Sequence, residues 1–187
     1  DGWSQTLIQA HRDVPEFGAI GCWRFYDQDF EPRFAERKIR SFAGGHRLME
    51  NCWVQGSGYV MKREVQEALG PIRARESFTG YCIRAALQGW TNGWYYPFLH
   101  EEHMDDPRSP YTEFKTQEAF FSRRPLSAIR NDVVLLEEWR NRVQWGALAV
   151  QKAPTDPRHF VGWRKKLRAV KRRIGRLAGR REPWRVK

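Results

Sequence analysis

The densest run of chemically capable side chains is HEEHMDDPRSPY, residues 100–111. Within its first seven positions stand two histidines and four carboxylates, namely His100, Glu101, Glu102, His103, Asp105 and Asp106. Imidazole nitrogens and carboxylate oxygens bind divalent cations, and carboxylates also accept hydrogen bonds from sugar hydroxyls or take protons as general bases. The prolines Pro107 and Pro110 stiffen the loop, but prolines also simply end a strand. The segment therefore fits a metal site, a catalytic loop or a polar surface turn.

Helices and strands alternate before this segment and must position it. Apolar spacing and turn residues predict helices at 3–12, 63–69 and 76–89, and strands at 19–26, around the Gly56-Ser57-Gly58 break, and at 91–99. Residues 27–47 are polar without a clear period, which indicates an excursion or a lid. Such alternation predicts an α/β fold in which helices cover a largely parallel sheet. A further helix is expected at about 131–145.

The charge of the chain is concentrated in its last thirty residues. Thirteen of the 33 Lys and Arg residues and one of the 22 acidic residues lie in 158–187, which leaves 20 basic and 21 acidic residues in 1–157. Apolar residues recur there at alternating spacings of three and four: Phe160, Trp163, Leu167, Val170, Ile174 and Leu177. This pattern predicts a basic amphipathic helix. It could lie on an anionic membrane surface, bind nucleic acid or pack on the body.

The aromatic residues at one end of this helix favour the membrane surface over nucleic acid, which we regard as an unlikely partner. Three cysteines, Cys22, Cys52 and Cys82, form no CxxC pair and adjoin apolar residues, which is typical of buried reduced thiols in a cytosolic protein. The sequence has no apolar run of the roughly 18 residues that a spanning helix needs and no signal sequence at its start. We therefore predict a cytoplasmic protein, attached peripherally at the inner face of the membrane through residues 158–187.

Several short motifs follow one another in an order that suggests a family. Gln55-Gly56-Ser57-Gly58-Tyr59-Val60-Met61-Lys62-Arg63 leads into a helix that ends in Leu69-Gly70. Cys82-Ile83-Arg84-Ala85 then precedes Gly89-Trp90, and Pro97 is followed six residues later by His103. In order and spacing, residues 1–110 resemble family 2 glycosyltransferases of the GT-A fold.

The resemblance implies that residues 1–125 are the C-terminal, acceptor-side half of a GT-A domain, a mixed sheet flanked by helices. Residues 126–157 would be a helix and linker, and 158–187 the basic helical tail. A family member transfers a sugar, typically a hexose, from a nucleotide-sugar donor to a saccharide or lipid-linked acceptor, with Mn²⁺ or Mg²⁺ as cofactor. The family's Asp-x-Asp motif ends just before a Gly-Trp like that of Gly2-Trp3, where this chain has only Asp1. We therefore expect the donor-binding half upstream, and a fragment that is inactive alone.

The resemblance also assigns roles to single residues. His103 matches the family histidine that meets the metal or the donor diphosphate. The family's catalytic acidic pair falls on Ser77 and Phe78, which cannot act as a base, so Glu76 is the nearest substitute and Asp105 and Asp106 are its rivals. The expected substrate-binding residues are Gly56, Ser57, Gly58, Arg84, Trp94 and His100. Whether the reaction inverts or retains the anomeric configuration stays open.

Two other classes compete with a transferase. A metal-dependent hydrolase built on HEEHMDD is disfavoured, because Pro97 and Pro107 leave no room for a long helix and the His-Glu-x-x-His arrangement is missing. A noncatalytic module remains the alternative, binding carbohydrate through the acceptor half of the fold, or nucleic acid or membrane through its basic tail. Turnover of a nucleotide sugar distinguishes the transferase from both.

Overall fold

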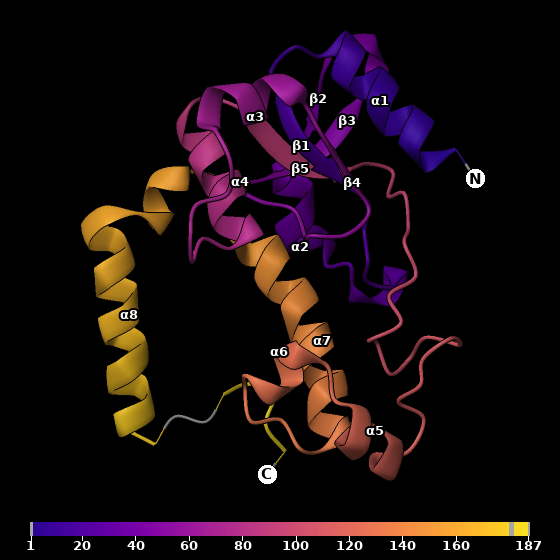
Figure 1. Cartoon of the computed structure of the whole chain (residues 1–187), viewed down its shortest axis with the longest axis vertical. Helices are drawn as coiled ribbons and strands as arrows, with labels where there is room; N and C mark the ends of the chain where they lie inside the picture. Colours follow the sequence, from indigo (N-terminus) through magenta and orange to yellow (C-terminus); the bar gives the residue numbers. More distant parts are fainter. Residues whose placement is uncertain (1, 180–181, 187) are drawn as a thin grey trace.

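The computed structural model (Figure 1) describes residues 2–179 and 182–186 of the 187-residue chain. Its centre is a five-stranded sheet of β1 (Phe17–Gly21), β2 (Ile39–Ser41), β3 (Arg47–Asn51), β4 (Tyr59–Met61) and β5 (Thr91–Tyr95). The spatial order is β2-β3-β5-β1-β4. Helices lie around this sheet, so the predicted α/β class is confirmed as a mixed sheet flanked by helices.

The expectation of a largely parallel sheet was wrong. Among the described strands only β1 and β5 pair in parallel, with Ile20 opposite Gly93, while the pairs β2–β3, β3–β5 and β1–β4 are antiparallel. The stretch 27–47, which we expected to be an excursion, contains β2 and the turn into β3. Gly44 and Gly45 in that turn have φ of 67° and 75°, a conformation that glycine adopts without strain. A connection this short can only join antiparallel strands.

Eight α-helices and four short 3₁₀ turns complete the described chain. The helices are α1 (Trp3–Asp13), α2 (Pro32–Ala35), α3 (Arg63–Leu69), α4 (Phe78–Leu87), α5 (Gln117–Arg123), α6 (Leu126–Ile129), α7 (Leu136–Lys152) and α8 (Gly162–Leu177). The 3₁₀ turns are η1 (Asp27–Asp29), η2 (Glu36–Lys38), η3 (Ala43–Gly45) and η4 (Pro157–Phe160). The helices predicted at 3–12, 63–69, 76–89 and 131–145 correspond to α1, α3, α4 and α7.

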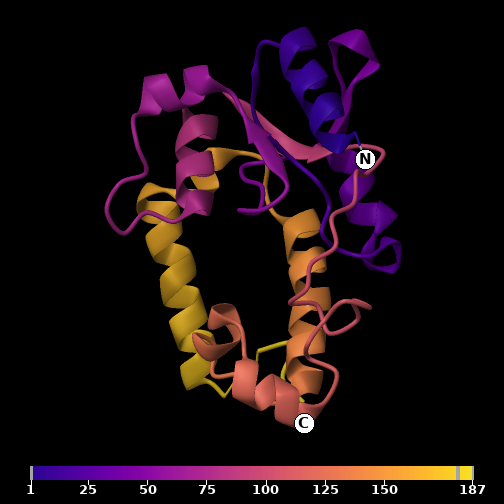
Figure 2. The same cartoon turned by 45° about the vertical axis from the view of Figure 1, so that its right-hand side comes forward.

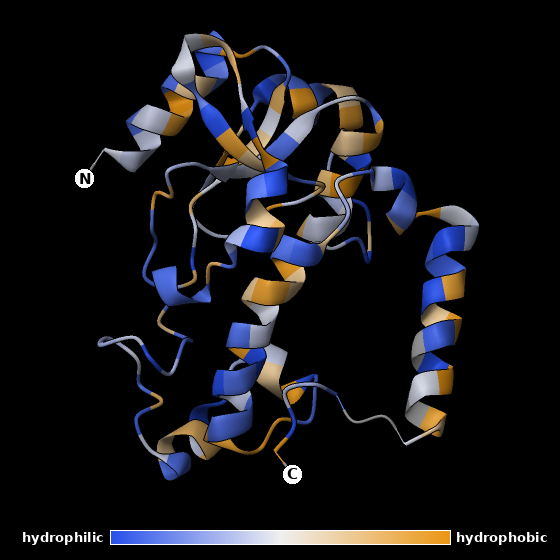
Figure 3. Cartoon of the chain, turned by 180° about the vertical axis from the view of Figure 1, so that it is seen from behind, coloured by the Kyte–Doolittle hydropathy of each residue, from blue (hydrophilic) through white to orange (hydrophobic). Residues whose placement is uncertain are grey.

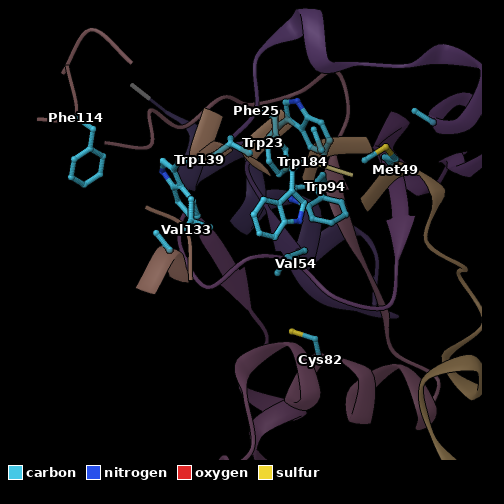
Figure 4. Close-up of a cluster of buried hydrophobic side chains, with 14 of the residues drawn as sticks. Trp23, Phe25, Met49, Val54, Cys82, Trp94, Phe114, Val133, Trp139 and Trp184 are labelled. Atoms are coloured by element: carbon cyan, nitrogen blue, oxygen red, sulfur yellow. The ribbon is translucent and has the colours of Figure 1, made fainter. Parts of the chain in front are cut away.

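The two faces of the sheet belong to two different cores, because successive strand residues point to opposite sides. Ile20 and Leu48 pack with Leu7 and Ala10 of α1 in the smaller cluster. Their neighbours on the strands, Ala19 and Met49, face the larger cluster, which also holds Trp23, Phe25, Trp94, Trp139 and Trp184. Figure 4 draws Trp184 with Trp23, Phe25 and Trp94 as side chains of this cluster.

The three cysteines are buried and unpaired, as predicted. Burial raises the pKa of the Cys22 and Cys82 thiols to about 11 and that of Cys52 to about 12. They are therefore protonated and act as small apolar core residues. Within residues 2–179 and 182–186, no helix is long and apolar enough to cross a bilayer.

Candidate functional site

The parallel pair β1–β5 delivers two loops to the same edge of the sheet. Beyond the strands, Trp23 N–H donates to the Leu99 carbonyl (2.7 Å) and Glu101 N–H donates to the Trp23 carbonyl (3.1 Å). Residues 24–27 and 100–106 therefore leave the sheet side by side. In α/β folds the crevice beyond the carboxyl ends of neighbouring parallel strands is where ligands usually bind.

These two loops enclose a pocket of about 240 Å³. Its lining comes from residues 24–27 of the first loop and from 100–103 and Asp106 of the second. A second, smaller cavity of about 30 Å³ shares Arg24, His103 and Asp106 with the first and is closed by Asp105 and by residues of α6 and α7. The segment 100–106 thus contributes to the walls of both cavities, with Asp105 on the smaller one only.

Arg24 lies between the two cavities and has an unusual set of contacts. Its Nη1 donates to Nε2 of His103 (3.1 Å), and its guanidinium lies 4.9 Å from the centre of the Phe25 ring. Burial lowers the pKa of Arg24, against the opposing charges of Glu101, Asp106 and Asp105. Within the described chain no carboxylate oxygen comes within 4.0 Å of it. A largely desolvated cation is therefore left without a direct ion pair.

His103 is the neighbour of this cation. Burial and, next, the charge of Arg24 lower the pKa of His103, so the imidazole is neutral at neutral pH. Both ring nitrogens face a donor, Arg24 Nη1 at Nε2 (3.1 Å) and the Asp105 N–H at Nδ1 (3.3 Å), and a neutral imidazole accepts at only one of them. We assign the acceptor to Nε2, the shorter and charge-assisted contact, which places the ring proton on Nδ1. With Nδ1 protonated, the 3.3 Å contact between Nδ1 and the Asp105 N–H is not a hydrogen bond.

Asp106 is occupied by a buried arginine. Arg108 donates from Nε and Nη2 to the two oxygens of Asp106 (3.0 and 2.7 Å) and from Nη1 and Nη2 to the two oxygens of Asp29 (2.9 and 2.7 Å). The exposed fractions of the three side chains are 12% for Arg108, 5% for Asp29 and 3% for Asp106. This triad joins the two loops, and it leaves Asp106 poorly placed to accept a substrate proton.

The rim of the pocket carries two further pairs. The Tyr26 hydroxyl donates to Glu102 (3.0 Å), and burial followed by this carboxylate raises the pKa of Tyr26 to about 12. His100 Nε2 lies 3.1 Å from an Asp27 oxygen. The rim thus offers hydroxyl, imidazole and carboxylate groups, which are the partners that sugar hydroxyls use.

The Gly-Ser-Gly break positions one carboxylate of the pocket. Ser57 Oγ donates to Glu101 (2.9 Å). Gly58 has a φ of 52°, and a Cβ added there would stand 1.8 Å from Oε2 of Glu101. The positive φ favours glycine at 58, and a larger residue there would also displace the Glu101 carboxylate, while Gly56 meets nothing closer than the Phe78 ring at 3.8 Å.

Three predicted site residues lie away from this pocket. Arg84 donates to both oxygens of Glu76 (3.1 and 2.8 Å) and to the Leu69 carbonyl (2.6 Å), which fixes the start of α4 to the end of α3. The hydrogen bonds from Arg84 are the largest cause of the lowered pKa of Glu76. Trp94 is buried in the larger core, with its indole N–H donating to Gln55. Neither Glu76, Arg84 nor Trp94 lines either cavity around Arg24.

The residues present do not fit a metal ion by themselves. Within the described part of the chain, no group of three or more His, Cys, Asp or Glu side chains is arranged to hold one. At His103 the Arg24 guanidinium stands where a cation would meet Nε2. The divalent cation expected from the resemblance stays a prediction.

The sequence reading missed Arg24, Tyr26, Asp27, Asp29 and Arg108. A signal existed, because CWRFYDQD places charged and aromatic residues directly after a buried strand, and Asp27-Gln28-Asp29 has Asp-x-Asp spacing. The structure separates the two aspartates: Asp27 is on the pocket rim and 89% exposed, whereas Asp29 is in the buried triad.

Comparison of the chain with family models, with curated proteins and with solved structures finds no match.

Proposed function

We propose that this chain forms the acceptor-side half of a GT-A-like glycosyltransferase, with its reaction site in the pocket beyond β1 and β5. The observation that carries this proposal is the Arg24 guanidinium, which is largely buried and faces no carboxylate within 4.0 Å in the described chain. A buried charge without a partner is costly, so its persistence in a pocket favours an anionic ligand. The nucleoside diphosphate of a sugar donor is such an anion.

Arg24 and His103 then act on the leaving group. As the bond between the sugar and the diphosphate breaks, its electron pair goes to a phosphate oxygen, and a preorganised guanidinium stabilises that charge. The Nη1 contact with His103 fixes the orientation of Arg24 and leaves its other N–H groups for the phosphate. The neutral imidazole supports this geometry without adding repulsion between two cations.

A carboxylate must take the proton of the acceptor hydroxyl. Of the three candidate bases, Glu76 and Asp106 are each bound through both oxygens to an arginine. The Asp105 carboxylate makes no hydrogen bond or ion pair within the described residues, and it lies in the cavity that also holds Arg24 and His103. We therefore assign Asp105 as the base that takes the acceptor hydroxyl proton while the hydroxyl oxygen attacks the anomeric carbon.

The anion site is tested by binding inorganic pyrophosphate to this chain. Calorimetry should show that Arg24→Met weakens binding by about ten- to a hundredfold, since a charge-assisted hydrogen bond contributes about 1.5–3 kcal/mol. Arg63→Met is the matched control, because Arg63 is exposed at the start of α3. Equal affinities of the wild type and the Arg24 variant would contradict the assignment.

The reaction itself is tested on a protein that contains this chain together with the proposed donor-binding half, with a nucleotide sugar and a divalent cation supplied. Asp105→Asn should lower kcat about a hundredfold or more, the usual contribution of a general base. His103→Ala should also lower turnover sharply, whereas Glu67→Gln on the exposed face of α3 should leave it unchanged. Saccharide binding without turnover would replace the transferase by a noncatalytic carbohydrate-binding module.

A further inference from the structure

Helix α8 presents an apolar stripe that the rest of the described chain does not cover. Five of its large apolar residues, spaced four, three, four and three positions apart, are Trp163, Leu167, Val170, Ile174 and Leu177, with exposed fractions between 44% and 82%. Over one face of an α-helix this spacing forms a single line. Figure 3 shows the hydrophobic residues of α8 alternating with hydrophilic ones along its length.

All the charged side chains of α8 are basic. Its 16 residues include eight Lys or Arg and no Asp or Glu. The bases that flank the stripe include Lys166, Lys171 and Arg173, all exposed. A partner must therefore offer negative charge and an apolar layer together.

The described segments before and after the helix contact the rest of the fold. Before it, the Phe160 ring packs edge-on against Trp53 (5.0 Å between centres), and Cys52 Sγ donates to the Thr155 carbonyl (3.0 Å). After it, Trp184 is buried in the larger core and Arg185 pairs with Glu138 of α7 (2.6 Å). Figures 1 and 2 show α8 beside α7 but apart from it in both views. The stripe is thus exposed on an element that the fold anchors.

We propose that α8 binds the surface of an anionic lipid bilayer. Lying in the interface, the helix buries its stripe among the acyl chains while its bases contact phosphate headgroups. Nucleic acid offers the charge but leaves the stripe in water. A second copy of α8 offers an apolar face but brings eight bases against eight. The surface assigned here is separate from the pocket beyond β1 and β5, so it stands or falls independently of the proposed chemistry.

The experiment is flotation of the full 187-residue chain with vesicles of phosphatidylcholine alone or with 30% phosphatidylglycerol. The wild type should bind the anionic vesicles, and binding should weaken in 0.5 M salt. The variant Lys166→Gln, Lys171→Gln, Arg173→Gln should partition about a hundredfold less, since each base near an anionic surface contributes about fivefold. The variant Leu167→Gln, Ile174→Gln should lose at least about tenfold.

Two matched controls distinguish the contribution of α8 to vesicle binding from the effects of the protein's total charge and total surface hydrophobicity. Arg12→Gln, Arg37→Gln, Arg63→Gln removes three exposed charges elsewhere, and Ile8→Gln, Leu87→Gln replaces residues that are 41% and 43% exposed on α1 and α4. Both controls should bind like the wild type, and circular dichroism checks that every variant is folded. Equal binding to both vesicle types, or the same loss in the controls, would overturn the proposal. So would tight binding of single-stranded DNA without vesicle binding, or a dimer that the Gln variants abolish.

Discussion

Two arginines on the same loop pair illustrate two uses of a buried charge. Arg108 makes four side-chain hydrogen bonds to two nearly buried carboxylates, and these raise its pKa despite burial. Arg24, between the two cavities, faces a neutral imidazole and an aromatic ring, and its pKa is lowered. The guanidinium of Arg108 is saturated, meaning that its hydrogen-bond donors are paired with carboxylates of the fold, and it joins two loops. The other retains unused donors, which is what a binding site requires.

The largest effect on the free energy of unfolding is expected at Arg108. Arg108→Met should lower the free energy of unfolding by about 3–5 kcal/mol, because it leaves Asp29 and Asp106 buried without their cation. Urea denaturation measures the change. The control is Arg123→Met, whose pair with Glu113 is more than half exposed on both sides and should contribute less than about 1 kcal/mol. Similar losses in the two variants would remove the distinction between the two arginines.

Arg185 is a second saturated guanidinium and should give an intermediate effect. It donates to Glu138, which is 7% exposed, and to the Asn131 and Asp132 carbonyls. Arg185→Met should cost about 2–3 kcal/mol in the same denaturation experiment, since one buried carboxylate loses its partner. A loss no greater than that of the Arg123 control would mean that the segment after α8 is not anchored by this contact.

His11 is a buried group without a full set of partners, but unlike Arg24 it is neutral in the folded protein. Its Nε2 contacts the Val60 carbonyl (3.0 Å), its Nδ1 has no partner among the described residues, and burial lowers its pKa below 6.5. The unfolded chain therefore binds a proton first as pH falls below about 6.5, and stability decreases from there downward, by less than about 1.4 kcal/mol per pH unit. His11→Gln should flatten the dependence of unfolding free energy on pH between 6.5 and 5.

His103→Gln should flatten this pH dependence further, because the pKa of His103 is lowered as well. An unchanged slope in both variants would contradict the assignment of neutral, buried rings.

The smallest effect on stability is expected at Arg24. Arg24→Met removes a desolvated cation that has no ion pair. The free energy of unfolding should therefore fall by less than about 1 kcal/mol, or increase. Urea denaturation of this variant beside Arg108→Met gives the direct contrast. A loss of 3 kcal/mol or more would show that Arg24 is a structural residue like Arg108.

Much of the fold follows from local sequence patterns. Periodicity located α1, α3, α4 and α7, whereas the strand expected around the Gly-Ser-Gly break is β4, which begins only after it. Strand direction was not predictable in this way. Alternation of helix and strand suggested parallel pairing, but β2 lies within a polar stretch without a clear period, and its antiparallel pairing with β3 depends on a turn at Gly44-Gly45.

The pocket was predicted in part. Its wall includes His100, Glu101, Glu102, His103 and Asp106 because their segment follows β5, while Asp105 lines the smaller cavity. Its other wall, 24–27, could not be found from residue spacing, since the two loops are more than seventy residues apart and meet only through the β1–β5 pairing. Nor can sequence tell which carboxylates are saturated, because Glu76 and Asp106 differ from Asp105 only in the arginines that folding brings to them.

The anchoring of α8 at both ends has a consequence for entropy. A free amphipathic tail must fold, stop tumbling and settle into one orientation when it meets a surface, and each of these steps opposes association. In this chain the Phe160–Trp53 contact and the buried Trp184 have already restricted those motions during folding. A partner that binds α8 is therefore linked to the sheet through the segments on both sides of the helix, and part of the entropy loss has occurred before it binds.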